Sequence, residues 1–84
     1  MPQTIQLLNR ALEKQTLSAW ARAFDISPST ITNARSRGRL SPTLAGNFAI
    51  KLGEDATKWI AIAALEAEPE STYKTALLSE ITLL

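Results

Sequence analysis

Cysteine and histidine are both absent from the 84 residues of this chain. Without cysteine there can be no disulfide and no thiolate-bound metal, and without histidine there is no side chain that ordinarily titrates near neutral pH. No pair of carboxylates in a recognisable pattern replaces them, and a chain of this length forms a single small core. We therefore expect a protein that is not an enzyme and that has no cofactor and no metal site.

Long apolar runs are lacking as well. The longest extends only from Trp59 to Leu65, whereas a helix needs about 20 apolar residues to cross a bilayer. The first ten residues do not combine a charged start with an apolar stretch, which is the pattern of a secretory signal. These absences predict a soluble cytoplasmic protein with no membrane partner.

Acidic residues are scarce in the first part of the chain. Residues 1–53 carry seven basic and two acidic side chains, whereas residues 54–84 carry two basic and six acidic ones. The net charge of +1 conceals this division. A basic front and an acidic back would favour one orientation on a polyanion, because only the front attracts phosphates.

Helical periodicity and turn residues predict an all-α fold: a compact bundle of five short helices with a C-terminal amphipathic helix. We expect helices from Thr4 to about Lys14, from a cap at Thr16 or Ser18 to about Phe24, from Pro28, from Pro42 to Gly53, from Ala56 to about Glu68, and from Ser71. Serine followed by proline is a strong helix start, since the hydroxyl accepts from a free amide and the ring already has a helical φ.

The segment from Leu17 to Arg39 has the spacing of two short helices joined by a tight turn. Such a unit needs a small residue in the first helix, a turn residue, and a branched residue in the second helix that packs back. Ala21, Asp25 and Ile31 stand at these three offsets. Units of this kind present their second helix to DNA, so a transcription regulator is the leading hypothesis.

The second helix of this unit has a polar outward face. With Ile31 and Ala34 turned inward, helical geometry leaves the opposite face to Ser29, Thr32, Asn33 and Ser36. An asparagine can bond adenine through two hydrogen bonds, and a threonine methyl can contact thymine. A solvated surface helix would show similar polarity, but the spacing and the cap together favour DNA binding.

Three arginines, at Arg35, Arg37 and Arg39, alternate with neutral residues at the end of the same helix. They predict contacts with the phosphate backbone, which supply affinity without sequence readout. An arginine run alone could also be a solvated loop. Trp20 and Trp59 could stack on bases, yet their apolar helical surroundings favour burial in the core.

Two further patterns have alternative interpretations. The spacing of Ser71 and Lys74 matches that of some acyl enzymes, but the supporting motifs are lacking and we regard it as coincidence. The C-terminal segment carries more apolar residues than a small core needs. It either packs on its own domain or closes a homodimer, and we expect a dimer interface at Leu77, Ile81, Leu83 and Leu84.

The order of these parts resembles the lambda-repressor-like (Cro/C1-type) helix-turn-helix family. The resemblance covers about residues 4–68 and is most specific in residues 17–52, with the stretches LSAWARAFDIS, PSTITNAR, GRLSP and LAGNFAIKLG. It implies a helix-turn-helix domain of residues 1–68 and a helical tail of residues 69–84. By this likeness Ser29, Thr32 and Asn33 read bases, while Ser18, Ser36 and Arg37 meet phosphates.

The chain departs from the family pattern at three positions. Leu17 stands where a polar, phosphate-contacting residue is frequent, Asp25 replaces the usual turn glycine, and Pro28 takes a position that is often a base-reading glutamine. These departures affect individual contacts more than the fold.

The resemblance implies a transcriptional regulator that binds double-stranded DNA, with no small-molecule ligand evident. The expected form is a repressor of the phage or prophage type, which binds a near-palindromic operator as a homodimer through the major groove in the cytoplasm of a prokaryotic or phage-infected cell. The alternative is a helix-turn-helix adaptor or antitoxin that acts mainly through protein contacts, with the apolar tail as its partner surface.

Overall fold

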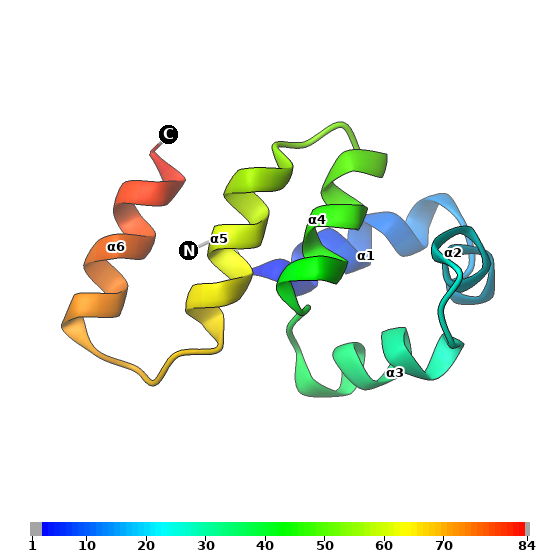
Figure 1. Cartoon of the computed structure of the whole chain (residues 1–84), viewed down its shortest axis with the longest axis horizontal. Coiled ribbons are helices and arrows are strands. Elements are labelled where there is room, and N and C mark those ends of the chain that lie inside the picture. Colours follow the sequence, from blue (N-terminus) through cyan, green and yellow to red (C-terminus); the bar gives the residue numbers. More distant parts are fainter. Residues whose placement is uncertain (1–2, 84) are drawn as a thin grey trace.

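A computed structural model describes residues 3–83, which form six α-helices and no strand. The helices are α1 (Thr4–Lys14), α2 (Leu17–Phe24), α3 (Pro28–Arg37), α4 (Pro42–Lys51), α5 (Ala56–Glu66) and α6 (Thr72–Thr82), as Figure 1 shows. The predicted all-α class is confirmed. None of the helices in these residues has the length and apolar character that crossing a membrane requires.

Side-chain caps explain where most of these helices begin. Five of the six start after a residue whose side-chain oxygen accepts a hydrogen bond from a backbone N–H of the first turn, and these residues are Thr16, Ser27, Ser41, Asp55 and Ser71. Of the two candidates for α2, Thr16 is therefore the cap, and Ser18 lies within the first turn.

One predicted boundary is wrong by two residues, because α5 ends at Glu66 and not at Glu68. The N–H of Glu68 bonds to the carbonyl oxygen of Leu65, which is the tighter spacing of a closing turn. Pro69 disfavours the helical conformation at the residue before it, so the helix stops early.

The core is centred on an aromatic cluster. The rings of Trp20, Phe24 and Phe48 have centroids 5.0 to 5.6 Å apart in tilted or edge-on pairs. Trp20 and Trp59 are only 5% and 7% exposed, which confirms their prediction as core residues. The indole N–H of Trp20 donates to the Ala11 carbonyl, and that of Trp59 to Glu54, so both polar atoms are satisfied.

Thr4 is a fully buried polar residue that connects three parts of the chain. Its Oγ1 accepts from the backbone N–H of Leu40 at 2.8 Å and bonds to the carboxylate of Glu66, which also accepts from the Thr4 N–H at 3.3 Å. The start of α1 is thereby fixed to the end of α5 and to the loop after α3.

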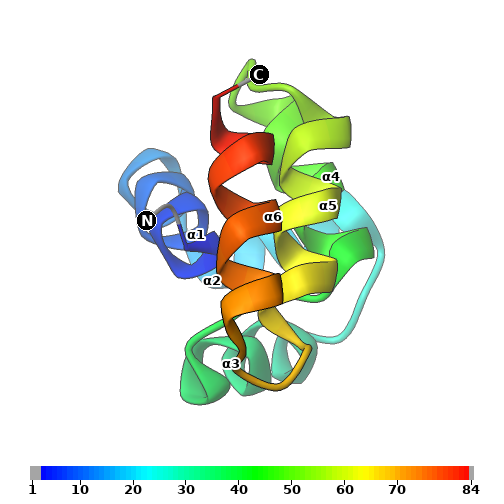
Figure 2. The same cartoon turned by 90° about the vertical axis from the view of Figure 1, so that its left-hand side faces the viewer.

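The helices place α3 at the edge of the molecule. α4, α5 and α6 run alternately up and down beside one another in Figure 1, and α6 packs on α5 through Leu78 and Ile81. α3 packs mainly against α2 and lies along the lower side of both views, together with the loop between α5 and α6 (Figures 1 and 2).

An ion pair joins α1 to the loop before α5. The guanidinium of Arg10 lies 2.5 Å from the carboxylate of Glu54. Hydrogen bonds from Arg10 and from the Trp59 indole stabilise the charged carboxylate, so the pKa of Glu54 lies below its usual value.

This lowered pKa predicts a pH-dependent contribution to stability. A carboxyl group with a lower pKa in the folded state stabilises the fold above its unfolded pKa, and this contribution disappears as the pH falls through the folded pKa. We expect Glu54→Gln to lower the free energy of unfolding at pH 7 by no more than about 1 kcal/mol, because the pair is partly exposed.

Thermal unfolding of wild type and variant from pH 7 down to strongly acidic pH would test this, with Glu13→Gln as a control that removes an exposed carboxylate from α1. The difference between wild type and Glu54→Gln should shrink toward acid pH. A constant difference, or none at pH 7, would contradict the expectation.

Candidate nucleic-acid interface

The turn between α2 and α3 has the conformation that the sequence predicts. Asp25 has φ 55° and ψ 48°, a left-handed conformation that aspartate tolerates better than most residues. The N–H of Ile26 then bonds back to the carbonyl of Ala21 at 3.0 Å. α2 packs against α3, and Ala21 and Ile31 are both buried, as the predicted contact between them requires.

α3 buries only two of its side chains. Ile31 and Ala34 are buried, and every other residue of this helix is exposed. The three predicted base-reading residues, Ser29, Thr32 and Asn33, are among the exposed ones. The exposed residues of α3 are mostly polar, and the helix lies along the lower side of the molecule in Figure 1.

Asn33 differs from its two neighbours on this face. The hydroxyl of Ser29 lies 2.8 Å from that of Ser27, and the hydroxyl of Thr32 donates to the Pro28 carbonyl. Both groups are therefore engaged near the start of the helix. Within residues 3–83 the Asn33 amide has no such partner, which leaves its donor and acceptor available to a ligand.

The predicted phosphate-contacting residues are all exposed: Ser18, Arg35, Ser36, Arg37 and Arg39. Arg35 and Arg37 stand in the last turn of α3, and Gly38 closes this helix in a left-handed conformation with φ 77°. Ser18 lies apart from them in the chain, in the first turn of α2. Exposed arginines at the end of an exposed helix can bind a phosphate backbone.

Arg39 has a second role that the sequence does not reveal. Its guanidinium donates to the backbone carbonyl of Glu66 at 3.3 Å, which ties the loop after α3 to the end of α5. The acidic half of the chain is therefore not confined to a back face. Glu66 at the end of α5 and Glu70 in the loop before α6 line the same cavity as Arg37 and Arg39, so the simple division into a basic front and an acidic back is wrong at this point.

The predicted dimer residues are placed differently from one another. Leu77 is 43% exposed and Leu83 is 81% exposed, whereas Ile81 is half-buried and packs against the core of its own chain. Leu84 lies outside the described residues. Tyr73, which was not among the predicted interface residues, is 84% exposed and precedes Leu77 by one helical turn.

The Ser71 and Lys74 spacing has a structural explanation. The Ser71 hydroxyl accepts from the Lys74 N–H at 3.0 Å and caps α6. The Lys74 ammonium turns instead to the Glu68 carbonyl and to the carboxylate of Glu70. In the described part of the chain no three acidic side chains gather as a metal site would need.

Comparison of the chain with known protein families, with curated proteins and with solved structures finds no match.

Proposed function

We propose that the protein is a sequence-specific regulator of transcription that binds double-stranded DNA by inserting α3 into the major groove. The observation that carries the proposal is the exposure of α3, in which only Ile31 and Ala34 are buried. An exposed helix with a polar face and basic side chains at its end suits the major groove of DNA, which is wide enough to admit an α-helix.

The side chains of α3 divide the work between readout and affinity. Asn33 is suited to adenine, because its amide can donate to the N7 acceptor of that base and accept from the N6 amino group in one plane. Arg35 and Arg37 are suited to the flanking phosphates, which they attract whatever the sequence. The exposed first turn of α2, with Ser18, offers a further phosphate contact through its hydroxyl and helix N–H groups.

A single copy of this unit would read only a few base pairs. We therefore propose that the protein acts as a homodimer on a near-palindromic operator, with half-sites separated by about 10–10.5 base pairs. The exposed face of α6, with Tyr73 and Leu77, supports association of two copies. Bound across a promoter, such a dimer represses by excluding the polymerase.

The arginines provide a test of the backbone contacts. We expect Arg37→Ala/Arg39→Ala to weaken binding to operator and to random DNA alike, and to lower the slope of log affinity against log salt by roughly one for each phosphate that is no longer bound. Titration of binding at several salt concentrations measures the slope. Thermal unfolding must accompany it, because Arg39 also bonds Glu66.

Lys51→Ala is the matched control for this pair. Lys51 is the exposed last residue of α4, and the end of this helix is its far end from α3 in Figure 1; its removal also subtracts a positive charge. The control should leave the salt slope unchanged. An unchanged slope in the arginine variant would show that these side chains do not contact DNA.

A second candidate function is a protein adaptor or antitoxin that uses α6 as its docking surface. It is favoured by the exposed apolar side chains of Tyr73, Leu77 and Leu83. A stable complex with a protein partner that forms without DNA, and survives Asn33→Ala, would support this alternative over the regulator.

A further inference from the structure

A cavity of about 320 Å³ opens between the loop after α3 and the start of α6. Three cationic side chains line it: Arg37 at the end of α3, Arg39 in the loop that follows, and Lys74 from α6. The sequence reasoning assigned the two arginines to DNA but had no function for Lys74. The cavity brings this lysine to the end of the proposed reading helix.

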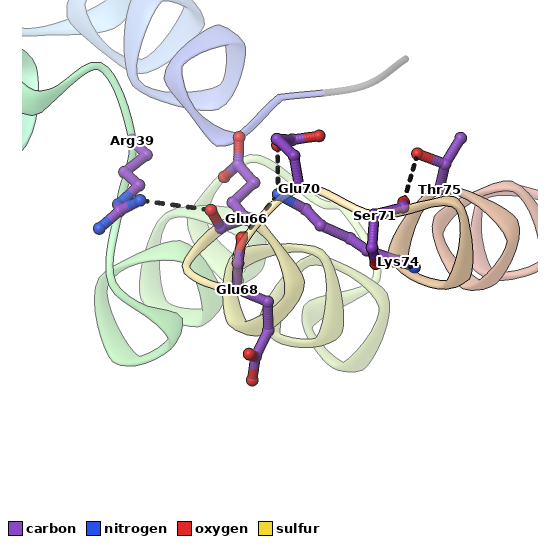
Figure 3. Close-up of polar contacts among 7 residues, drawn as sticks. All are labelled: Arg39, Glu66, Glu68, Glu70, Ser71, Lys74 and Thr75. Carbon is purple, nitrogen blue, oxygen red and sulfur yellow. Dashed lines mark hydrogen bonds and ion pairs between the residues drawn. The ribbon is translucent and has the colours of Figure 1, made fainter.

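Lys74 is an unusually buried charge, with only 8% of its side chain exposed. Its ammonium donates to the Glu68 carbonyl at 2.9 Å and to a Glu70 carboxylate oxygen at 2.6 Å, as Figure 3 shows. Burying a charge is costly unless an opposite charge accompanies it. The site is therefore more stable with an anion beside Lys74 than without one.

The anion now beside Lys74 is the more exposed partner of the pair. The Glu70 side chain is 85% exposed and belongs to the loop before α6, so its carboxylate loses little burial when it turns into water, and another anion that enters the cavity can replace it beside Lys74. Glu66, the other carboxylate at the cavity, is held by Thr4. If Glu70 leaves, Lys74, Arg37 and Arg39 remain as the cationic residues that line the cavity.

We propose that this cavity is a phosphate site for the DNA backbone and that Glu70 occupies the place of the phosphate in the free protein. A phosphate offers acceptor oxygens to the ammonium and to both guanidinium groups, and it restores the negative charge that Lys74 requires. The segments that line the cavity, the loop after α3 and the start of α6, lie on the same side of the molecule as α3 (Figures 1 and 2), so α6 would extend the DNA contact beyond the helix-turn-helix unit. This inference rests on the proposed function.

Glu70→Gln tests the exchange directly, with Glu68→Gln as its matched control. Both variants remove one negative charge from the same loop, but the Glu68 carboxylate points away from Lys74 (Figure 3). We expect Glu70→Gln to tighten duplex binding by roughly two- to fivefold beyond the control, the range of an exposed ion pair that no longer competes. Equal affinities of the two variants would overturn the proposal.

Lys74→Gln supplies the second readout. It should lower the salt slope of duplex binding by about one, and Glu70→Gln should no longer tighten binding when combined with it. Lys74→Arg keeps the charge and should keep the slope. If Lys74→Gln fails to fold, the comparison of Glu70→Gln with Glu68→Gln still tests whether Glu70 competes with a phosphate.

Inorganic phosphate separates this site from the proposed function. If the wild-type protein binds no duplex, the proposed function fails, and amide shifts at Gly38, Lys74 and Thr75 are then followed by NMR as phosphate replaces chloride at constant ionic strength. Shifts that Lys74→Gln abolishes would support a site for free phosphate groups. Their absence would overturn the site as well.

Discussion

Asn33→Ala is expected to weaken binding to the preferred operator by roughly 5- to 150-fold, equivalent to about 1–3 kcal/mol, while binding to random DNA changes little. Asn33 is exposed on α3, and the other two reading candidates already use their hydroxyls within the helix. Its amide is therefore the group best able to discriminate between bases. Competition binding with operator and random duplexes measures both affinities.

Asn9→Ala is the matched control, since it removes the same amide from an exposed position on α1. It should leave both affinities unchanged. Equal losses on operator and random DNA for Asn33→Ala would assign the residue to the backbone, and an unchanged operator preference would remove it from the reading face.

Tyr73→Glu/Leu77→Glu is expected to give a folded monomer with operator affinity about 10²- to 10⁴-fold lower, because coupling two half-sites contributes a gain of that order. Both side chains are exposed on α6, so the core is not disturbed. Two added carboxylates on a paired apolar face would be buried together and repel each other. Analytical ultracentrifugation and operator titration measure the two effects.

Ile50→Glu controls for the added charge, because Ile50 is 65% exposed on α4 and is not on α6. It should leave the proposed dimer intact. A wild-type protein that sediments as a monomer while operator binding is saturated would contradict the dimer, and a double variant that remains dimeric would move the interface away from α6.

Local chemistry made α3 predictable from sequence. Ser27 caps α3, Asp25 takes the left-handed turn, and Ala21 and Ile31 are buried on either side of this turn, so the features that define the unit involve residues close in the chain. Caps and turns depend on residue types within a few positions, so their pattern is visible without the fold.

Long-range contacts were not predictable in the same way. Thr4 and Glu66 are separated by 62 positions, and no periodicity links them. The burial of Lys74 likewise depends on the loop that folds over it, whereas lysine is ordinarily exposed.

The faces of α6 illustrate a third case. Apolar residues occur on both sides of this helix, so the sequence could not show which side meets α5. The structure turns Leu78 and part of Ile81 inward and leaves Tyr73 and Leu77 outside. An interface predicted from apolar content alone therefore included one residue that serves the chain's own core.

Selection of bound duplexes from a random library by the full chain is the most direct test of sequence-specific DNA binding. The selected sequences show both whether the protein prefers a sequence and whether that sequence is symmetric. We expect enrichment of a near-palindrome with half-sites about 10–10.5 base pairs apart. With Asn33→Ala, the preference at defined positions of this sequence should be lost. Recovery of duplexes without any enriched sequence would contradict sequence-specific binding.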